Sequence, residues 1–394
     1  MKKFLEYFGM TAVSVVIFII SFIGLIILIS NINMGDFSFF VAIAVIIVWG
    51  IMYGLLMKVL WSKNSWFVKH AKIIGIVALG FCVCGFLALQ AKGVYNRYQA
   101  SLTIKEVEVN IAEYTPFSDT SKIAKLDEPS TLSFTEEDDL PYLDGATALY
   151  PIYSAFVEAV YPNKKYNANK SEVQCTTTIN AYDELISGNA DVIFAAQPSA
   201  KQRERAESTG VDLHMTPIGS EAFVFFVNNK NQVDNLSIGQ LRGIYTGEIT
   251  NWQSVGGKDI EIDAFQRNED SGSQTMFLKV MDGVNVKEAP LERESIGMGM
   301  IIEQAANYKN HKGAVGFSFL YYATQMKDNN KIKLLSIDGV QPTLETIRSK
   351  QYPFTANFYA ITNGEPTGNT KLLIDWILSP QGQSLIEKTG YVGI

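Results

Sequence analysis

The chain has 394 residues, 47% hydrophobic residues, a net charge of −7 and three cysteines. Three cysteines exclude a disulfide-dense scaffold or an array of zinc sites, and the acidic balance argues against a nucleic-acid binder, which needs a basic face. The averages hide two different parts. Residues 1–100 carry eight basic and two acidic side chains, a net charge of +6, so residues 101–394 must carry −13.

Three long runs without a charged residue follow one another near the N-terminus, at roughly 8–30, 37–57 and 73–91. Each has about the length that a helix needs to cross a hydrocarbon core of ~30 Å. We therefore expect residues 1–92 to form a membrane anchor of three transmembrane helices. A cleaved signal peptide is the alternative for the first run, which is however too long and lacks a cleavage site.

The lysines predict which side of the membrane each loop occupies. Lys2 and Lys3 precede the first run, four lysines lie in the loop 58–72, and the loop between the first two runs has none. Because basic loops stay on the cytoplasmic side, we expect everything after about residue 92 to be extracytoplasmic. Residues 93–140, which end in an acidic patch, are predicted to be a solvated stalk or linker.

From residue 141 onward, apolar segments alternate with segments of helical periodicity. Strands are expected at 171–177, 191–196, 222–227, 260–266, 313–318, 331–336 and 356–362. Helices are expected at 149–160, 179–187, 201–208, 237–245, 273–281, 297–308 and 369–388. This alternation predicts an α/β fold with mostly parallel sheets, and its length favours two lobes.

The most informative stretch for function is 265–275. A strand is expected to end at Arg267, and Ser271-Gly272-Ser273 then opens a helix. Free N–H groups at a helix start, hydroxyls and a guanidinium group together suit an oxyanion, and glycine lets the backbone approach a ligand closely. The alternative is an ordinary serine N-cap beside a surface arginine.

Two further turns have the same character. Asp144-Gly145-Ala146-Thr147 precedes one predicted helix, and Thr176-Thr177-Thr178 precedes another. Ligands of open α/β sheets bind at the carboxyl ends of strands. The three turns therefore predict one anion pocket, although the sequence leaves open which of the three threonines faces it.

Several of these segments also carry a family resemblance. They are Asp144–Thr147, Asp191–Pro198, Leu241–Trp252, Arg267–Thr275 and Gly313–Phe317, of which Leu241–Trp252 is highly characteristic. Through them the region 141–394 resembles the phosphate-binding proteins of bacterial phosphate ABC importers, which have the type II periplasmic-binding-protein fold.

The resemblance implies a Venus flytrap whose two lobes are joined by hinge strands and close on the ligand. Lobe one is expected at 141–221 and 357–394, and lobe two at 222–356. It also implies a receptor that captures phosphate and delivers it to an ABC permease, with no cofactor and no enzymatic activity; the expected three-helix membrane anchor is a departure from the family, which has a signal peptide or a lipid instead. The ligand contacts that it implies are Thr147, Ala148, Thr176 or Thr177, Arg267, Ser271, Gly272 and Ser273.

One departure from the family concerns selectivity. The family typically has an aspartate after the strand that here ends in Phe194-Ala195-Ala196, and its carboxylate accepts a hydrogen bond from the O–H group of hydrogen phosphate. This chain has Gln197 at or near that place, and an amide both accepts and donates. We therefore include Gln197 among the ligand-binding candidates and leave open whether the ligand is phosphate or another oxyanion.

Two other functions compete with transport. A sensor or adaptor would pass ligand state through the membrane helices to a partner, although the loop 57–73 contains no output motif. An enzyme is disfavoured because His70, His214 and His311 are widely separated in sequence, with Asp212 as the only potential metal ligand close to His214. The sequence also lacks the common hydrolase, zinc-protease and P-loop motifs.

Overall fold

A computed structural model describes residues 109–394, apart from 290–293, 296–297, 308–310 and 328. The three predicted membrane spans lie outside the described residues. Within the described part of the chain, no helix combines the length and the apolar character that a bilayer crossing requires. The region 101–394 is a compact unit of its own.

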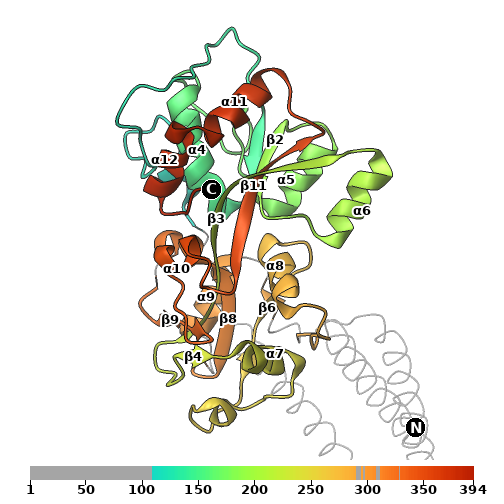
Figure 1. Cartoon of the computed structure of the whole chain (residues 1–394), viewed down its shortest axis with the longest axis vertical. Coiled ribbons are helices and arrows are strands. Elements are labelled where there is room, and N and C mark those ends of the chain that lie inside the picture. Colours follow the sequence, from blue (N-terminus) through green and yellow to red (C-terminus); the bar gives the residue numbers. More distant parts are fainter. Residues whose placement is uncertain (1–108, 290–293, 296–297, 308–310, 328) are drawn as a thin grey trace, which may run out of the picture. The chain divides into compact units, whose positions relative to one another are not determined.

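The described region forms two lobes, which Figure 1 shows one above the other. Two strands belong to both lobes, β3 (Leu213–Asn228) and β11 (Thr355–Asn363). They pair antiparallel along most of their length, from Thr355 opposite Ala222 to Asn363 opposite Leu213. Because β3 is long enough to run through both lobes, the two lobes share one continuous sheet.

Lobe one contains the chain before β3 and after β11. Its elements are η1 (Ile111–Tyr114), β1 (Leu143–Gly145), η2 (Thr147–Leu149), α4 (Tyr150–Val160), α5 (Thr177–Ile186), β2 (Val192–Ala195), α6 (Ala200–Thr209), α11 (Gly368–Leu378) and α12 (Pro380–Thr389).

Lobe two contains the chain between those strands. Its elements are β4 (Asn235–Leu236), α7 (Ile238–Thr246), η3 (Trp252–Val255), β5 (Asp263–Ala264), β6 (Gln266–Arg267), α8 (Gly272–Met281), β7 (Glu294–Ser295), α9 (Met298–Asn307), β8 (Ala314–Phe319), η5 (Tyr322–Met326), β9 (Ile332–Leu334), β10 (Ser336–Ile337) and α10 (Leu344–Arg348).

The main sheet has the strand order β1-β2-β11-β3-β8-β5, and β9 also pairs with β3. The β1–β2 and β5–β8 pairs are parallel, whereas β11 and β3 run antiparallel to all their neighbours. The α/β prediction is confirmed, and the two-stranded sheets β4–β10 and β6–β7 are parallel. The expectation of mostly parallel pairing is wrong for the main sheet. The reason is that the shared strands β3 and β11 run in the opposite direction to the strands that they pair with in each lobe.

Each lobe has its own aromatic core. In lobe one, Phe156 packs against Phe194 and Trp376, with ring centroids 6.0 and 6.1 Å apart. In lobe two, Phe277 stacks on Phe317 at 4.6 Å. Most of the buried apolar side chains therefore fall into one cluster for each lobe, and the shared strands contribute to both.

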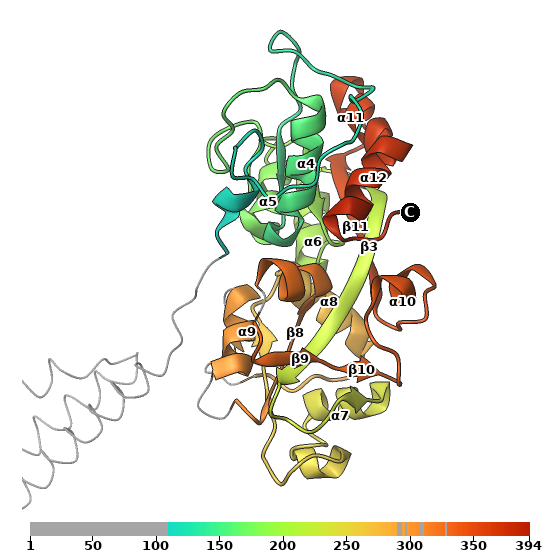
Figure 2. The same cartoon turned by 90° about the vertical axis from the view of Figure 1, so that its left-hand side faces the viewer.

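The segment before β1 differs from the solvated stalk that the sequence suggested. In its described part, Tyr114, Ile123 and Phe134 are buried against the core of lobe one. The side chain of Gln381 also accepts a hydrogen bond from the backbone N–H of Thr131 at 2.8 Å and donates one to Pro129 at 2.9 Å. Scattered aromatic and apolar residues therefore fix a segment that has no helical or strand periodicity (Figure 2).

Replacement of Phe156 by alanine tests the core of lobe one. The ring is fully buried, so its removal leaves a cavity, and we expect a loss of about 3–5 kcal/mol in the free energy of unfolding. Chemical denaturation measures this loss. Leu372→Ala is the control, because that side chain is 50% exposed in the same lobe; equal losses in the two variants would contradict the assigned core.

Candidate functional site

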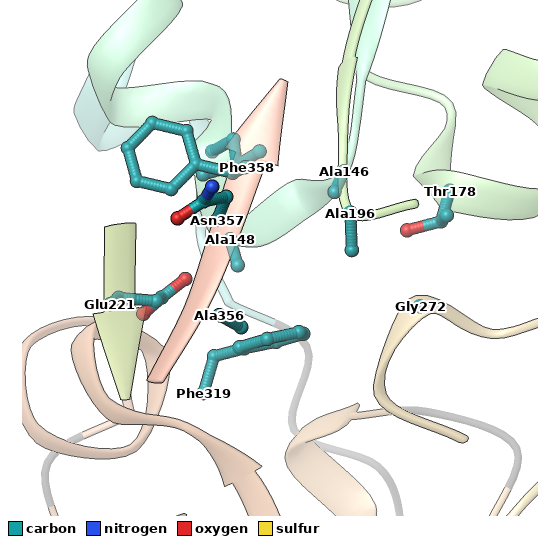
Figure 3. Close-up of a pocket in the computed structure, with 11 residues that line it drawn as sticks. Ala146, Ala148, Thr178, Ala196, Glu221, Gly272, Phe319, Ala356, Asn357 and Phe358 are labelled. Carbon is teal, nitrogen blue, oxygen red and sulfur yellow. The ribbon is translucent and has the colours of Figure 1, made fainter. Parts of the chain in front are cut away.

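A pocket lies between the lobes, beside the shared strands (Figure 3). Both lobes and both shared strands contribute to its wall. The lining residues are Ala146, Ala148, Leu149, Thr178, Ala196, Glu221, Gly272, Phe319, Ala356, Asn357 and Phe358. The three predicted turns thus reach one pocket, the first through Ala146, Ala148 and Leu149, the second through Thr178 and the third through Gly272.

Asp144 holds two of these turns together at the edge of lobe one. Its carboxylate accepts hydrogen bonds from the backbone N–H groups of Gly145 at 2.7 Å and Thr176 at 2.8 Å, and from the Thr176 hydroxyl. Burial raises the pKa of Asp144, while these donors act in the opposite direction. Gly145 is required here, since a β-carbon would lie 2.5 Å from the carbonyl oxygen of Phe194.

The structure separates the roles of the three threonines. The Thr176 hydroxyl is bonded to Asp144, and Thr177 is exposed with a φ of +82°, a strained value for a β-branched residue. Thr178 is 9% exposed and lines the pocket. The candidates Thr176 and Thr177 therefore belong to the turn, whereas Thr178 is the threonine that lines the pocket.

The loop of lobe two brings a helix start to the pocket. Ser271 caps α8 by accepting a hydrogen bond from the N–H of Gln274 at 3.2 Å. Gly272, the first residue of α8, lines the pocket. It lies so close to Thr178 that a β-carbon at this position would be 3.2 Å from the Thr178 hydroxyl. The Ser273 side chain is fully buried, and its hydroxyl has no hydrogen-bond partner among the described residues.

Arg267 lies at the end of β6, where the sequence placed it. Its side chain is 8% exposed, and its backbone N–H donates to the Gln274 side chain at 2.9 Å. Arg267, Ser271 and Ser273 are buried and do not line the pocket. Thr147 is half-buried at the start of η2, next to the lining residue Ala148.

Asp270 of the same loop touches lobe one. Its carboxylate accepts a hydrogen bond from the Ser199 hydroxyl at 2.6 Å and lies 3.3 Å from the Lys201 ammonium group. Its carbonyl oxygen accepts from the Gln202 side chain at 3.2 Å. Asp270 has a φ of +64°, so a left-handed turn in front of α8 places these groups against α6.

The position after β2 is apolar on the pocket side. Ala196 lines the pocket, whereas Gln197 is half-buried and does not. The Ala196 carbonyl accepts a hydrogen bond from the Tyr182 hydroxyl at 2.7 Å. Gln197 was a ligand-binding candidate of the sequence, but the pocket wall at this position is the methyl group of Ala196.

Sequence reasoning missed the residues that the shared strands supply. Glu221 of β3 is 5% exposed and accepts a hydrogen bond from the Tyr321 N–H at 3.3 Å, and burial raises its pKa to about 8. Asn357 of β11 also lines the pocket. In the sequence, Glu221 could have been noticed because an acidic residue stands directly before the apolar run Ala222–Val227.

The described residues contain no group of three or more His, Cys, Asp or Glu side chains that could hold a metal ion. What the pocket does contain is two helix starts. α5 begins at Thr177 and α8 at Gly272, and both helices have ten residues. Helix starts carry free N–H groups and a positive end of the helix dipole. The arrangement suits a small anion held by hydrogen bonds.

Comparison with known proteins shows the family to which the chain belongs. The family model described as PBP superfamily domain matches residues 142–381. The phosphate-binding protein PstS of Bacillus subtilis is 31% identical over 210 residues, which are 52% of this chain and 64% of that protein, slightly less than two thirds of its length. That of Borreliella burgdorferi is 25% identical over 261 residues, 64% of this chain and 89% of that protein.

A solved structure shares the fold. It is that of a Clostridium perfringens protein described as a phosphate ABC transporter substrate-binding protein with bound phosphate, with a TM-score of 0.52 and 22% identity over 64% of this chain and 98% of that one. The two-lobed architecture, the pocket between the lobes and the family match over more than half of the sequence agree: the chain belongs to the PBP superfamily.

Proposed function

We propose that this chain is an extracytoplasmic receptor that captures phosphate between its lobes and delivers it to an ABC permease. The observation that carries the proposal is the meeting of two helix starts at one pocket, α5 through Thr178 and α8 through Gly272. Such N–H groups bind phosphate without a net positive protein. The relatives named phosphate-binding protein PstS favour this oxyanion.

Arg267 supplies the positive charge in this proposal. It lies four residues before Ser271 in the loop that leads to α8, and its side chain is buried. A buried guanidinium group binds two oxygens of a phosphate through parallel hydrogen bonds. The hydroxyl of Ser273, which has no partner among the described residues, is a further donor of suitable kind.

Calorimetry of the full-length chain with inorganic phosphate, at neutral pH and low salt, tests the ligand. We expect saturable binding, and a rise of about 30-fold or more in the dissociation constant of Arg267→Ala, since loss of a buried charge that pairs with the ligand costs about 2–5 kcal/mol. Arg205→Ala is the control, because that arginine is 49% exposed and pairs with Asp183 within lobe one. Absence of heat with phosphate would refute the assignment; sulfate, molybdate and phosphonates then identify the oxyanion.

Closure of the lobes is the second part of the proposal. Asp270 on lobe two bonds to Ser199, Lys201 and Gln202 on lobe one, and the next three residues are the proposed ligand loop. A ligand that bridges the lobes and these contacts favour the same closed arrangement. They therefore raise each other's stability.

The replacement Asp270→Asn tests this coupling. Asparagine tolerates the left-handed backbone but removes the charge that faces Lys201, so we expect phosphate affinity to fall about threefold to tenfold. Asp282→Asn is the matched control, since Asp282 also has a positive φ, of 51°, but is 78% exposed and contacts only lobe two. Equal affinities of Asp270→Asn and the unchanged chain would contradict a closing role.

We also propose that residues 1–92 form a membrane anchor of three helices and that residues 141–394 form the binding domain. Residues 93–140 would connect the two. The three apolar runs and the lysine distribution support the anchor. We expect the full-length chain to stay with membranes during alkaline carbonate washing, and the chain without residues 1–92 to become soluble. Release of the full-length chain by the wash would contradict the anchor.

A further inference from the structure

Glu221 has a position that simple anion binding does not explain. It lies on β3 opposite Ala356 of β11, at the point where the shared strands pass from one lobe to the other. Its side chain is 5% exposed, and its carboxyl group points into the space that Ala148, Ala356 and Phe319 also border (Figure 3). Of the described residues that line the pocket, Glu221 alone is ionisable.

The surroundings of Glu221 disfavour a negative charge. The carboxyl group has one hydrogen-bond donor among the described residues, the Tyr321 N–H at 3.3 Å. The titratable groups that face it are phenols, Tyr321 and Tyr391, with Tyr114 next to both. Burial raises the pKa of Glu221 to about 8, and no basic side chain of the described region offsets this rise.

The charge state of Glu221 matters because the proposed ligand is an anion. A carboxylate in the same poorly solvated pocket repels an oxyanion, since two like charges interact strongly where water is scarce. A neutral carboxylic acid does not repel it, and its O–H group is a hydrogen-bond donor. The pocket therefore tolerates Glu221 beside an oxyanion in only one of its two protonation states.

We propose that Glu221 is a protonation switch of the binding pocket: as a neutral acid it admits the oxyanion, and as a carboxylate it expels it. This inference rests on the proposed function, because it needs an oxyanion in the pocket. Its consequence is a coupling in both directions. Anion affinity falls as the pH rises through the titration of Glu221, and anion binding favours proton uptake by the protein.

The full-length chain and Glu221→Gln are compared by calorimetry with inorganic phosphate from pH 6 to pH 9.5. Glutamine has nearly the same shape but cannot ionise. Because phosphate itself titrates in this range, the informative quantity is the ratio of the two association constants at each pH. We expect the unchanged chain to lose affinity about tenfold or more relative to Glu221→Gln as the pH rises. Glu248→Gln, which changes an exposed glutamate, should keep the profile of the unchanged chain.

A measurement without ligand keeps the test independent of phosphate. The pKa of Glu221 is raised in the folded chain, so its contribution to stability is present at low pH and is lost as the pH rises through the folded value. We expect the melting temperature of the unchanged chain to fall relative to that of Glu221→Gln between pH 6 and pH 9. If the melting temperatures of the two proteins change with pH in the same way, Glu221 does not titrate in this range and the switch is overturned.

The outcomes separate the two proposals. If neither protein binds phosphate, the proposed function fails, and the coupling to an anion fails with it. If both bind with the same pH profile, phosphate binding stands and the switch alone is refuted. A ratio that falls with pH, together with diverging melting temperatures, supports the switch.

Discussion

The arrangement of the whole region depends on two antiparallel strands that belong to both lobes. β3 and β11 pair with each other and also with the strands of each lobe, so neither lobe can leave the other without breaking a continuous sheet. The pairing of the two strands shifts register between Phe358 and Tyr359. Phe358 also lines the pocket, so a ligand bound there would contact the strands that join the lobes.

The binding region carries a net charge of −13 if it is counted from residue 101, yet we propose that it binds an anion. The resolution is local, because N–H groups at two helix starts and one buried arginine act over a few ångströms, while distant surface charges are screened. In such a pocket each additional ionisable group has a large effect. In our proposal, the methyl group of Ala196 and the acid of Glu221, which both line the pocket, therefore affect selectivity more than the total charge does.

Much of the fold followed from the sequence. Apolar periodicity placed most helices within one or two residues of their observed bounds, for example α5 and α8. It failed where local geometry overrides periodicity. The strand expected at 171–177 is reduced to a single bridge at Val173, because the chain already turns toward Asp144 at Thr176. The helix expected at 369–388 is broken at Ser379, where Pro380 starts a new helix.

The candidate site was predictable as three turns but not as individual side chains. A shift of one or two positions decides whether a threonine or a glutamine faces the pocket, and only the hydrogen bonds of Asp144 and Tyr182 fix that choice.

The most direct test of oxyanion binding between the lobes is the crystal structure of the full-length chain with arsenate, whose arsenic scatters anomalously. Our account predicts one arsenate between the lobes, within hydrogen-bond distance of the Thr178 hydroxyl and the Gly272 N–H. An arsenate bound elsewhere, or a pocket without it at saturating concentration, would contradict the account.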